Sequence, residues 1–147
     1  MTVDEEHHKL AYENAVYREQ LSLLQREMDR ITLATMDLSN AAKTVEKISD
    51  GEGLIPIGGG AYVRAAMSTQ KILIPIGSGY IIEMDKNEAE VEIKKRMGAT
   101  ERAIEKLNEE FGSLSKKFQE SGTKLRDLQN QLALSKRVDE NIGEDYL

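Results

Sequence analysis

Two glycine runs are the segments of this sequence that first suggest ligand chemistry. Gly58-Gly59-Gly60 and Gly77-Ser78-Gly79 offer successive backbone amides of the kind that cradle phosphate. A phosphate-binding loop needs the pattern G-x-x-x-x-G-K-[ST] opening into a helix, and a dinucleotide fingerprint needs G-x-G-x-x-G before a helix. Here each run leads into strand-forming residues instead. We therefore interpret both runs as hairpin turns and expect no nucleotide site.

The remaining reactive side chains do not form a recognisable catalytic or metal site. His7 and His8 are adjacent, so on a helix they point about 100° apart and cannot bind one metal as an i, i+4 pair would. The absence of cysteine excludes disulfides, thiolate metal sites and a cysteine nucleophile. The many carboxylates are spread along polar helical segments. We predict no enzymatic activity, no metal and no cofactor.

Charge and composition exclude two classes of partner. The net charge is -6 with both signs mixed along the chain, so no basic stripe is present for nucleic acid or anionic lipid. The first ten residues are acidic and polar, unlike a signal peptide, and no long apolar run follows. Aromatic residues are only 5% and Trp is absent, which favours an elongated chain over a thick core. We expect a cytoplasmic protein that binds neither nucleic acid nor membrane.

The N-terminal third of the sequence predicts one long helix. Between residues 3 and 49 there is no Gly or Pro. Apolar residues recur there every seven positions, at Val3, Leu10, Tyr17, Leu24, Ile31, Leu38 and Val45. A second series, three residues earlier in each heptad, is interrupted by polar residues such as His7 and Asn14. The pattern predicts one side of a coiled coil with a mixed seam.

The last third of the chain repeats the heptad pattern with alternating spacings of four and three. Its core positions are Ile93, Met97, Thr100, Ile104, Leu107, Phe111, Leu114, Phe118, Ser121, Leu125, Leu128 and Leu132. Neither amphipathic helix can bury its seam alone. We therefore expect the two helices to pair with each other.

A glycine-rich internal repeat separates the two helical segments. Leu54-Ile55-Pro56-Ile57-Gly58 returns as Leu73-Ile74-Pro75-Ile76-Gly77, and each copy reads as strand, glycine turn, strand. Pro56 and Pro75 lack an amide donor, which places them at a sheet edge or a bulge. Four short strands with open edges invite pairing with other chains. The apolar side chains expected at this assembly surface are Leu54, Ile55, Ile57, Tyr62, Val63, Ile72, Ile74, Ile76, Ile81 and Ile82.

Together these elements predict an α+β fold in one elongated domain. A long antiparallel two-helix coiled coil is formed by residues 1–50 and 88–147, and residues 51–87 form two β-hairpins between the helices at one end. With Asp50 opposite Glu88, Leu38 is expected to face Thr100 and Tyr17 to lie near Ser121. Both chain termini then lie together at the far tip.

This combination of helices and hairpins resembles the prefoldin family over nearly the whole chain. The segments that carry the resemblance are Leu54 to Val63 and Ile72 to Ile82, each with its Ile-Pro-Ile-Gly sequence. In that family alpha-class subunits have two hairpins and beta-class subunits have one. The duplicated repeat is therefore similar to the alpha class, whereas the helices share only their length and heptad character with the family.

The resemblance implies a chaperone subunit that works without ATP. Two alpha and four beta subunits would join their hairpins in a β-barrel body, and the coiled-coil tips would hold unfolded client proteins and pass them to a group II chaperonin. The client-binding residues expected at the tip are Val3, Leu10, Tyr12, Val16, Leu128, Leu132, Leu134, Val138 and Ile142. Because Asn14, Ser121 and Gly122 weaken the seam nearby, we expect the tip to open locally.

Two alternative interpretations are compatible with the same sequence pattern. The apolar tip residues could be scattered surface side chains of the kind every protein has. The chain could also be a structural coiled-coil spacer or adaptor that uses its hairpins merely to oligomerise. A spacer would share the helices and the sheet but would not bind denatured proteins of unrelated sequence.

Overall fold

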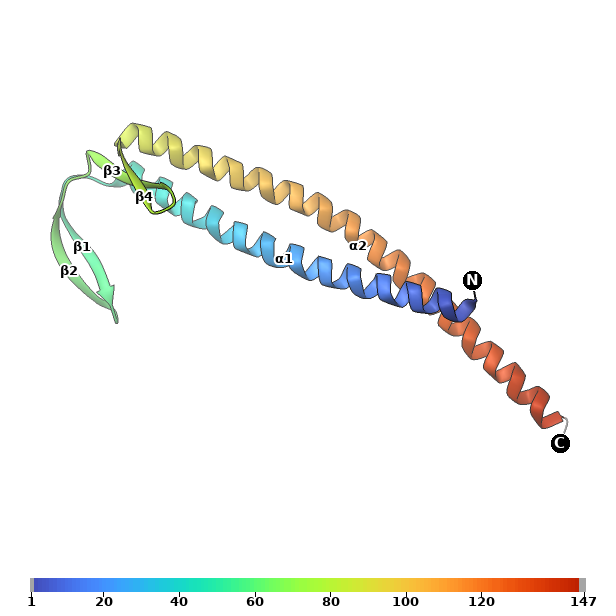
Figure 1. Ribbon diagram of the computed structural model, residues 1–147. Coiled ribbons are helices and arrows are strands. Elements are labelled where there is room, and N and C mark those ends of the chain that lie inside the picture. Colours follow the sequence, from blue (N-terminus) through green and yellow to red (C-terminus); the bar gives the residue numbers. More distant parts are fainter. Residues whose placement is uncertain (1, 146–147) are drawn as a thin grey trace. The chain divides into compact units, whose positions relative to one another are not determined.

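The computed structural model describes the chain from Thr2 to Asp145, with side chains up to Gly143. Two long helices flank four strands in the order α1 (Val3–Lys47), β1 (Gly51–Gly58), β2 (Ala61–Met67), β3 (Lys71–Gly77), β4 (Tyr80–Asp85) and α2 (Lys86–Asp145) (Figure 1). The predicted α+β fold with two hairpins between two long helices is confirmed. The predicted outer limits, residues 1 and 147, lie outside the described residues.

Helix α1 begins with a capping box. The Thr2 Oγ1 accepts a hydrogen bond from the Glu5 amide at 3.2 Å, and the Glu5 carboxylate accepts one from the Thr2 amide at 3.0 Å. This reciprocal pair satisfies donors that the first turn of a helix would leave unpaired. Asp4, Glu5 and Glu6 also place negative charge near the positive end of the helix dipole.

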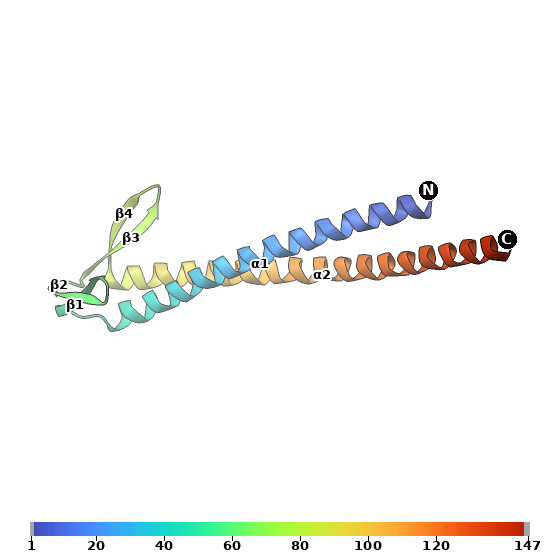
Figure 2. The ribbon, with the colours of Figure 1, turned by 90° about the horizontal axis from the view of Figure 1, so that it is seen from below.

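The four strands form two separate two-stranded antiparallel sheets, β1 with β2 and β3 with β4 (Figure 2). Each hairpin closes through two residues with positive φ, Gly59 and Gly60 in the first and Ser78 and Gly79 in the second. Two residues of that conformation give the turn whose twist matches paired strands. The register shifts directly after Pro56 and Pro75, so the strand pairing is irregular at the two positions where a sheet edge or a bulge was expected.

The described part of the chain falls into two units, one containing the residues up to Arg30 and from Glu105, the other Ile31–Ile104. The second unit contains a small apolar core, which we call the junction core. Its buried members are Ala42 and Val45 of α1, Ile74 of β3, and Ala89 and Ile93 of α2. Leu38, Ala41, Ile72 and Met84 pack against it. One strand of the second hairpin is thus part of the same core as both helices.

Polar bonds close the base of the hairpins in the same unit. The Thr69 amide and hydroxyl both donate to Oδ1 of Asp50, at 2.6 and 2.8 Å, and the Lys86 Nζ donates to the Ile48 carbonyl oxygen at 2.7 Å. The two bonds from Thr69, the backbone one first, lower the pKa of Asp50, and the charge of Lys86 acts in the same direction. Through these bonds Asp50, the residue before β1, is connected with the loop that precedes β3.

The pairing of the helices differs from the expected register by about one turn. The Thr35 hydroxyl donates to Thr100 Oγ1 at 2.8 Å, so Thr35 lies where Leu38 was expected. In the other unit Asn14 approaches Gly122, where Tyr17 was expected to lie against Ser121. The prediction was wrong because heptad core positions recur every three or four residues, so neighbouring registers juxtapose equally apolar positions.

Candidate functional site

The helix ends that were predicted to bind clients lie in the unit formed by residues up to Arg30 and from Glu105. We call residues 2–16 and 121–143 the terminal segment. Within it, α2 continues past the N-terminal end of α1 (Figures 1 and 2). The continuing part therefore has no α1 residue alongside it to cover its apolar side chains.

The predicted tip residues divide into an exposed and a half-buried group. The exposed side chains are those of Val3, Tyr12, Leu134, Val138 and Ile142. The half-buried side chains, which serve the seam between the helices, are those of Leu10, Val16, Leu128 and Leu132. Leu134, Val138 and Ile142 are spaced by four residues, so they line one face of the continuing α2. Leu134 is 60% exposed, which leaves that face open to a partner.

A polar notch interrupts the seam next to these residues. Asn14 and Ser121 are buried, with 9% and 5% of their surface exposed. The Asn14 amide donates to the Phe118 carbonyl oxygen at 3.3 Å, whereas the Ser121 hydroxyl has no hydrogen-bond partner among the described residues. Gly122 adds no side chain. Buried polar groups without full hydrogen bonding are costly, so this level of the seam is weakly held.

The hairpins carry the second set of predicted residues. The exposed side chains of this set are Leu54, Ile55, Ile57, Tyr62, Val63, Ile76, Ile81 and Ile82. Each two-stranded sheet also has open edges whose backbone groups can pair with further strands. Such a surface favours association with another chain over exposure to water.

Ile72 and Ile74 do not share this exposure. Ile74 is 4% exposed in the junction core, and Ile72 packs against that core. In the first hairpin the equivalent of Ile74 is Ile55, which is 46% exposed. Leu73 and Tyr80 are also exposed on the second hairpin, and neither was among the predicted assembly residues. The internal repeat could have found Leu73, because it occupies the position of Leu54.

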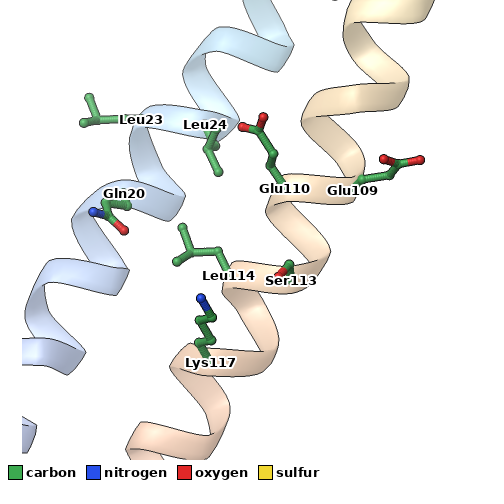
Figure 3. A pocket seen from close by; sticks show the side chains of 8 residues that line it. All are labelled: Gln20, Leu23, Leu24, Glu109, Glu110, Ser113, Leu114 and Lys117. Atoms are coloured by element: carbon green, nitrogen blue, oxygen red, sulfur yellow. The ribbon is translucent and has the colours of Figure 1, made fainter.

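A groove runs between the helices in the unit that contains the terminal segment (Figure 3). Its volume is about 630 Å³, and it is lined by Gln20, Leu23, Leu24, Glu109, Glu110, Ser113, Leu114 and Lys117. Leu24 of α1 and Leu114 of α2 point toward the space between the helices. The lining is apolar at its centre and charged at its margin, as expected for a coiled-coil seam.

The part of the chain that the structure describes contains neither a metal cluster nor a membrane-spanning helix. No group of three or more His, Cys, Asp or Glu side chains lies close enough there to hold a metal ion. Neither α1 nor α2, over the described residues, contains a stretch sufficiently long and apolar to span a membrane. The surfaces that stand out are therefore the apolar terminal segment and the apolar hairpins.

Comparison with known proteins agrees with this arrangement. The model of the prefoldin subunit family matches residues 17–131. A prefoldin subunit alpha of Methanococcus aeolicus is 30% identical, over 88% of this chain and 87% of the relative. A prefoldin subunit alpha of Pyrococcus horikoshii is 26% identical, over 86% of this chain and 90% of the relative.

Two solved structures have a similar fold. The crystal structure of the prefoldin beta subunit from Thermococcus strain KS-1 superposes with a TM-score of 0.62 at 15% identity, covering 86% of this chain and 94% of the other. The cryo-EM structure of filamentous PFD from Methanocaldococcus jannaschii gives a TM-score of 0.50 at 22% identity, covering 80% and 95%. At these identities the likeness concerns the fold.

Proposed function

The chain belongs to the prefoldin family, and from this premise we propose that it holds unfolded polypeptides through its terminal segment. It is a prefoldin chaperone subunit, and its relatives are alpha subunits. The observation that carries the proposal is the face of Leu134, Val138 and Ile142, which is exposed where α2 continues past α1. A flexible apolar surface suits clients of no fixed sequence.

The polar notch supports a mechanism of capture by local opening. Few large apolar contacts hold the seam at Asn14, Ser121 and Gly122, so separating the helix ends there costs little free energy. Opening would expose Leu10, Leu128 and Leu132, which are half-buried in the closed seam. Several subunits acting on one client would convert weak contacts into useful holding.

Assembly through the hairpins is the second part of the proposal. The exposed apolar side chains and open edges of β1–β2 and β3–β4 would join those of prefoldin beta subunits in a β-barrel, with two alpha and four beta subunits in the complex. The complex would act in the cytoplasm without ATP and deliver its clients to a group II chaperonin. A nucleotide-free mechanism is supported by the glycine runs, which form hairpin turns.

A structural spacer or adaptor is the alternative. It would use the same helices and hairpins, but it would have no use for an exposed apolar stripe at the end of α2. The similarity to alpha subunits over most of the chain does not favour it.

The experiment that tests client holding replaces the stripe itself. In the complex with a beta subunit, Leu134→Ser, Val138→Ser and Ile142→Ser together should weaken suppression of the aggregation of a denatured test protein. A matched control is Leu33→Ser with Met36→Ser, because both side chains are equally exposed on α1 outside the terminal segment. The size of the complex, measured by light scattering, should stay unchanged in both variants.

Deleting residues 1–12 and 129–147 gives the stronger form of the test, most clearly when the beta-subunit tips are shortened as well. Holding that survives this deletion in an intact complex would mean that the binding surface lies on the hairpin body or along the helices.

A further inference from the structure

The two hairpins have nearly the same sequence repeat but differ in what covers them. Ile55 and Ile74 occupy equivalent positions, yet Ile55 is 46% exposed and Ile74 is 4% exposed. The difference arises because β3 lies against α1 and α2 in the junction core, whereas among the described residues that core contains none from β1 or β2. The second hairpin is thus fixed to the helices through one face.

Among the described residues one side chain of α2, that of Arg96, bonds to the backbone of β3. The Arg96 guanidinium donates through Nη1 to the Pro75 carbonyl oxygen at 2.8 Å. Its Nε donates to Oε1 of Glu92 at 3.0 Å, which orients the guanidinium from the preceding turn of the same helix. Pro75 is the residue directly before the bulge of β3, so the bond is made where the strand changes register.

The junction core holds β3 at Ile74, and the attachment is open beside that core. A space of about 360 Å³ remains between β3 and the helices, lined in part by Leu38, Ile72, Ile74 and Ile93. Within this space β3 makes few dispersion contacts with the helices beyond those of the junction core. A directional bond from a charged donor adds an orientation that non-directional apolar contacts do not supply.

We propose that Arg96 is a positioning residue for assembly, which holds β3–β4 on the helix pair and so presets the place from which this hairpin meets a partner subunit. The inference rests on the proposed assembly through the hairpins and assigns a different role to each hairpin. β1–β2 joins the partner with both faces exposed, whereas β3–β4 joins it with Ile72 and Ile74 already covered by the helices. Preorganisation of this kind strengthens association by reducing the ordering that binding requires.

The test compares Arg96→Ala with Arg102→Ala, a more exposed arginine on the same helix for which the described residues show no ion pair. Hydrogen exchange of the chain in complex with a beta subunit should show amides of β3 and β4 exchanging about ten-fold faster in Arg96→Ala, the size expected for one hydrogen bond from a charged donor. Exchange in β1 and β2 should stay unchanged. Arg96→Lys should restore part of the protection, since it keeps one donor.

Titration with the beta subunit supplies the functional measurement. About ten-fold more beta subunit should be needed for half-assembly of Arg96→Ala, with Arg102→Ala like the wild type. Unchanged exchange in β3–β4, or assembly that is equal or tighter in Arg96→Ala, would overturn the inference. Failure of the wild-type chain to assemble would instead contradict the proposed function, and the exchange of the free chain would still decide whether Arg96 positions the hairpin.

Discussion

The junction core and the terminal segment show how one helix pair can be held firmly at one level and weakly at another. Ala42, Val45, Ala89 and Ile93 bury apolar side chains together with a strand residue. In the terminal segment the buried positions Asn14 and Ser121 are polar, and large apolar side chains are exposed instead. This difference indicates that the heptad pattern determines which face of each helix pairs. The side chains at each level determine how strongly the two helices are held together.

The largest expected effect is a loss of stability in the junction core. Ile93→Ala removes a side chain that is 7% exposed and should lower the free energy of unfolding by about 2–4 kcal/mol. Val91→Ala, two residues away and 68% exposed, is the control and should change it by less than about 0.5 kcal/mol. Thermal unfolding of the assembled complex measures both. Equal effects would show that the junction is not a packed core.

A gain of stability is expected at the polar notch. Ser121→Ala removes a buried hydroxyl without a partner among the described residues and should stabilise the terminal segment by about 1–2 kcal/mol. Ser113→Ala, exposed on the same helix, should gain only the small difference in helix propensity. Hydrogen exchange of residues 2–16 and 121–143 should slow only in Ser121→Ala. A destabilised Ser121→Ala would indicate that the hydroxyl is bonded in solution.

Replacing Gly122, the glycine of the polar notch, is expected to increase stability by a smaller amount. A Cβ at Gly122 would lie 3.7 Å from the Asn14 amide nitrogen, an ordinary contact, so Gly122→Ala should add about 1 kcal/mol through helix propensity. Gly112→Ala is the control, because a Cβ there would meet open space and Gly112 lies outside the terminal segment. It should increase the stability of the helix by the same amount. If local opening serves capture, aggregation suppression should decrease for Gly122→Ala alone. If both variants suppress aggregation of the denatured protein equally well, client capture does not depend on local opening of the terminal segment.

The smallest effect concerns pH at the base of the hairpins. The bonds from Thr69 lower the pKa of Asp50 below its ordinary value near 4, so the unfolded chain binds more protons in acid than the folded chain. The stabilising contribution is complete above that ordinary value and is lost as the pH falls through the lowered one. Stability measured between about pH 5 and pH 2 should therefore fall less steeply in Asp50→Asn than in the wild type. Thr69→Val, which keeps the backbone donor, should be intermediate.

Much of the fold was predictable from the sequence because its patterns are local. The heptad spacing indicated both helices, and the repeated Ile-Pro-Ile-Gly segments indicated both hairpins and their bulges. The register was not predictable to better than a turn, since Thr35 and Leu38 are both seam residues. In the observed pairing a side-chain hydrogen bond joins Thr35 and Thr100, and heptad periodicity does not encode such a bond.

The surfaces were predictable in part for a similar reason. Tyr12, Val16, Leu134 and Val138 lie outside or beside the heptad series of the sequence. Tyr12, Leu134 and Val138 are exposed, as that position predicts, whereas Val16 is half-buried in the seam. The burial of Ile74 was not foreseen, because both faces of each hairpin are apolar and alternation gives no preference for one face. Only the packing of β3 against the helices distinguishes it from Ile55.

The helix pair also has a consequence for the order of folding. Its bonds join residues of increasing separation along the chain: 38 positions for Lys86 and Ile48, 65 for Thr35 and Thr100, and 104 for Asn14 and Phe118. Closing a long loop costs more conformational entropy than extending one already closed. We therefore expect the hairpins and the neighbouring turns of the helices to form first. Pairing of α1 with α2 then proceeds from the hairpins toward the two chain ends. A newly made subunit thus completes the terminal segment last.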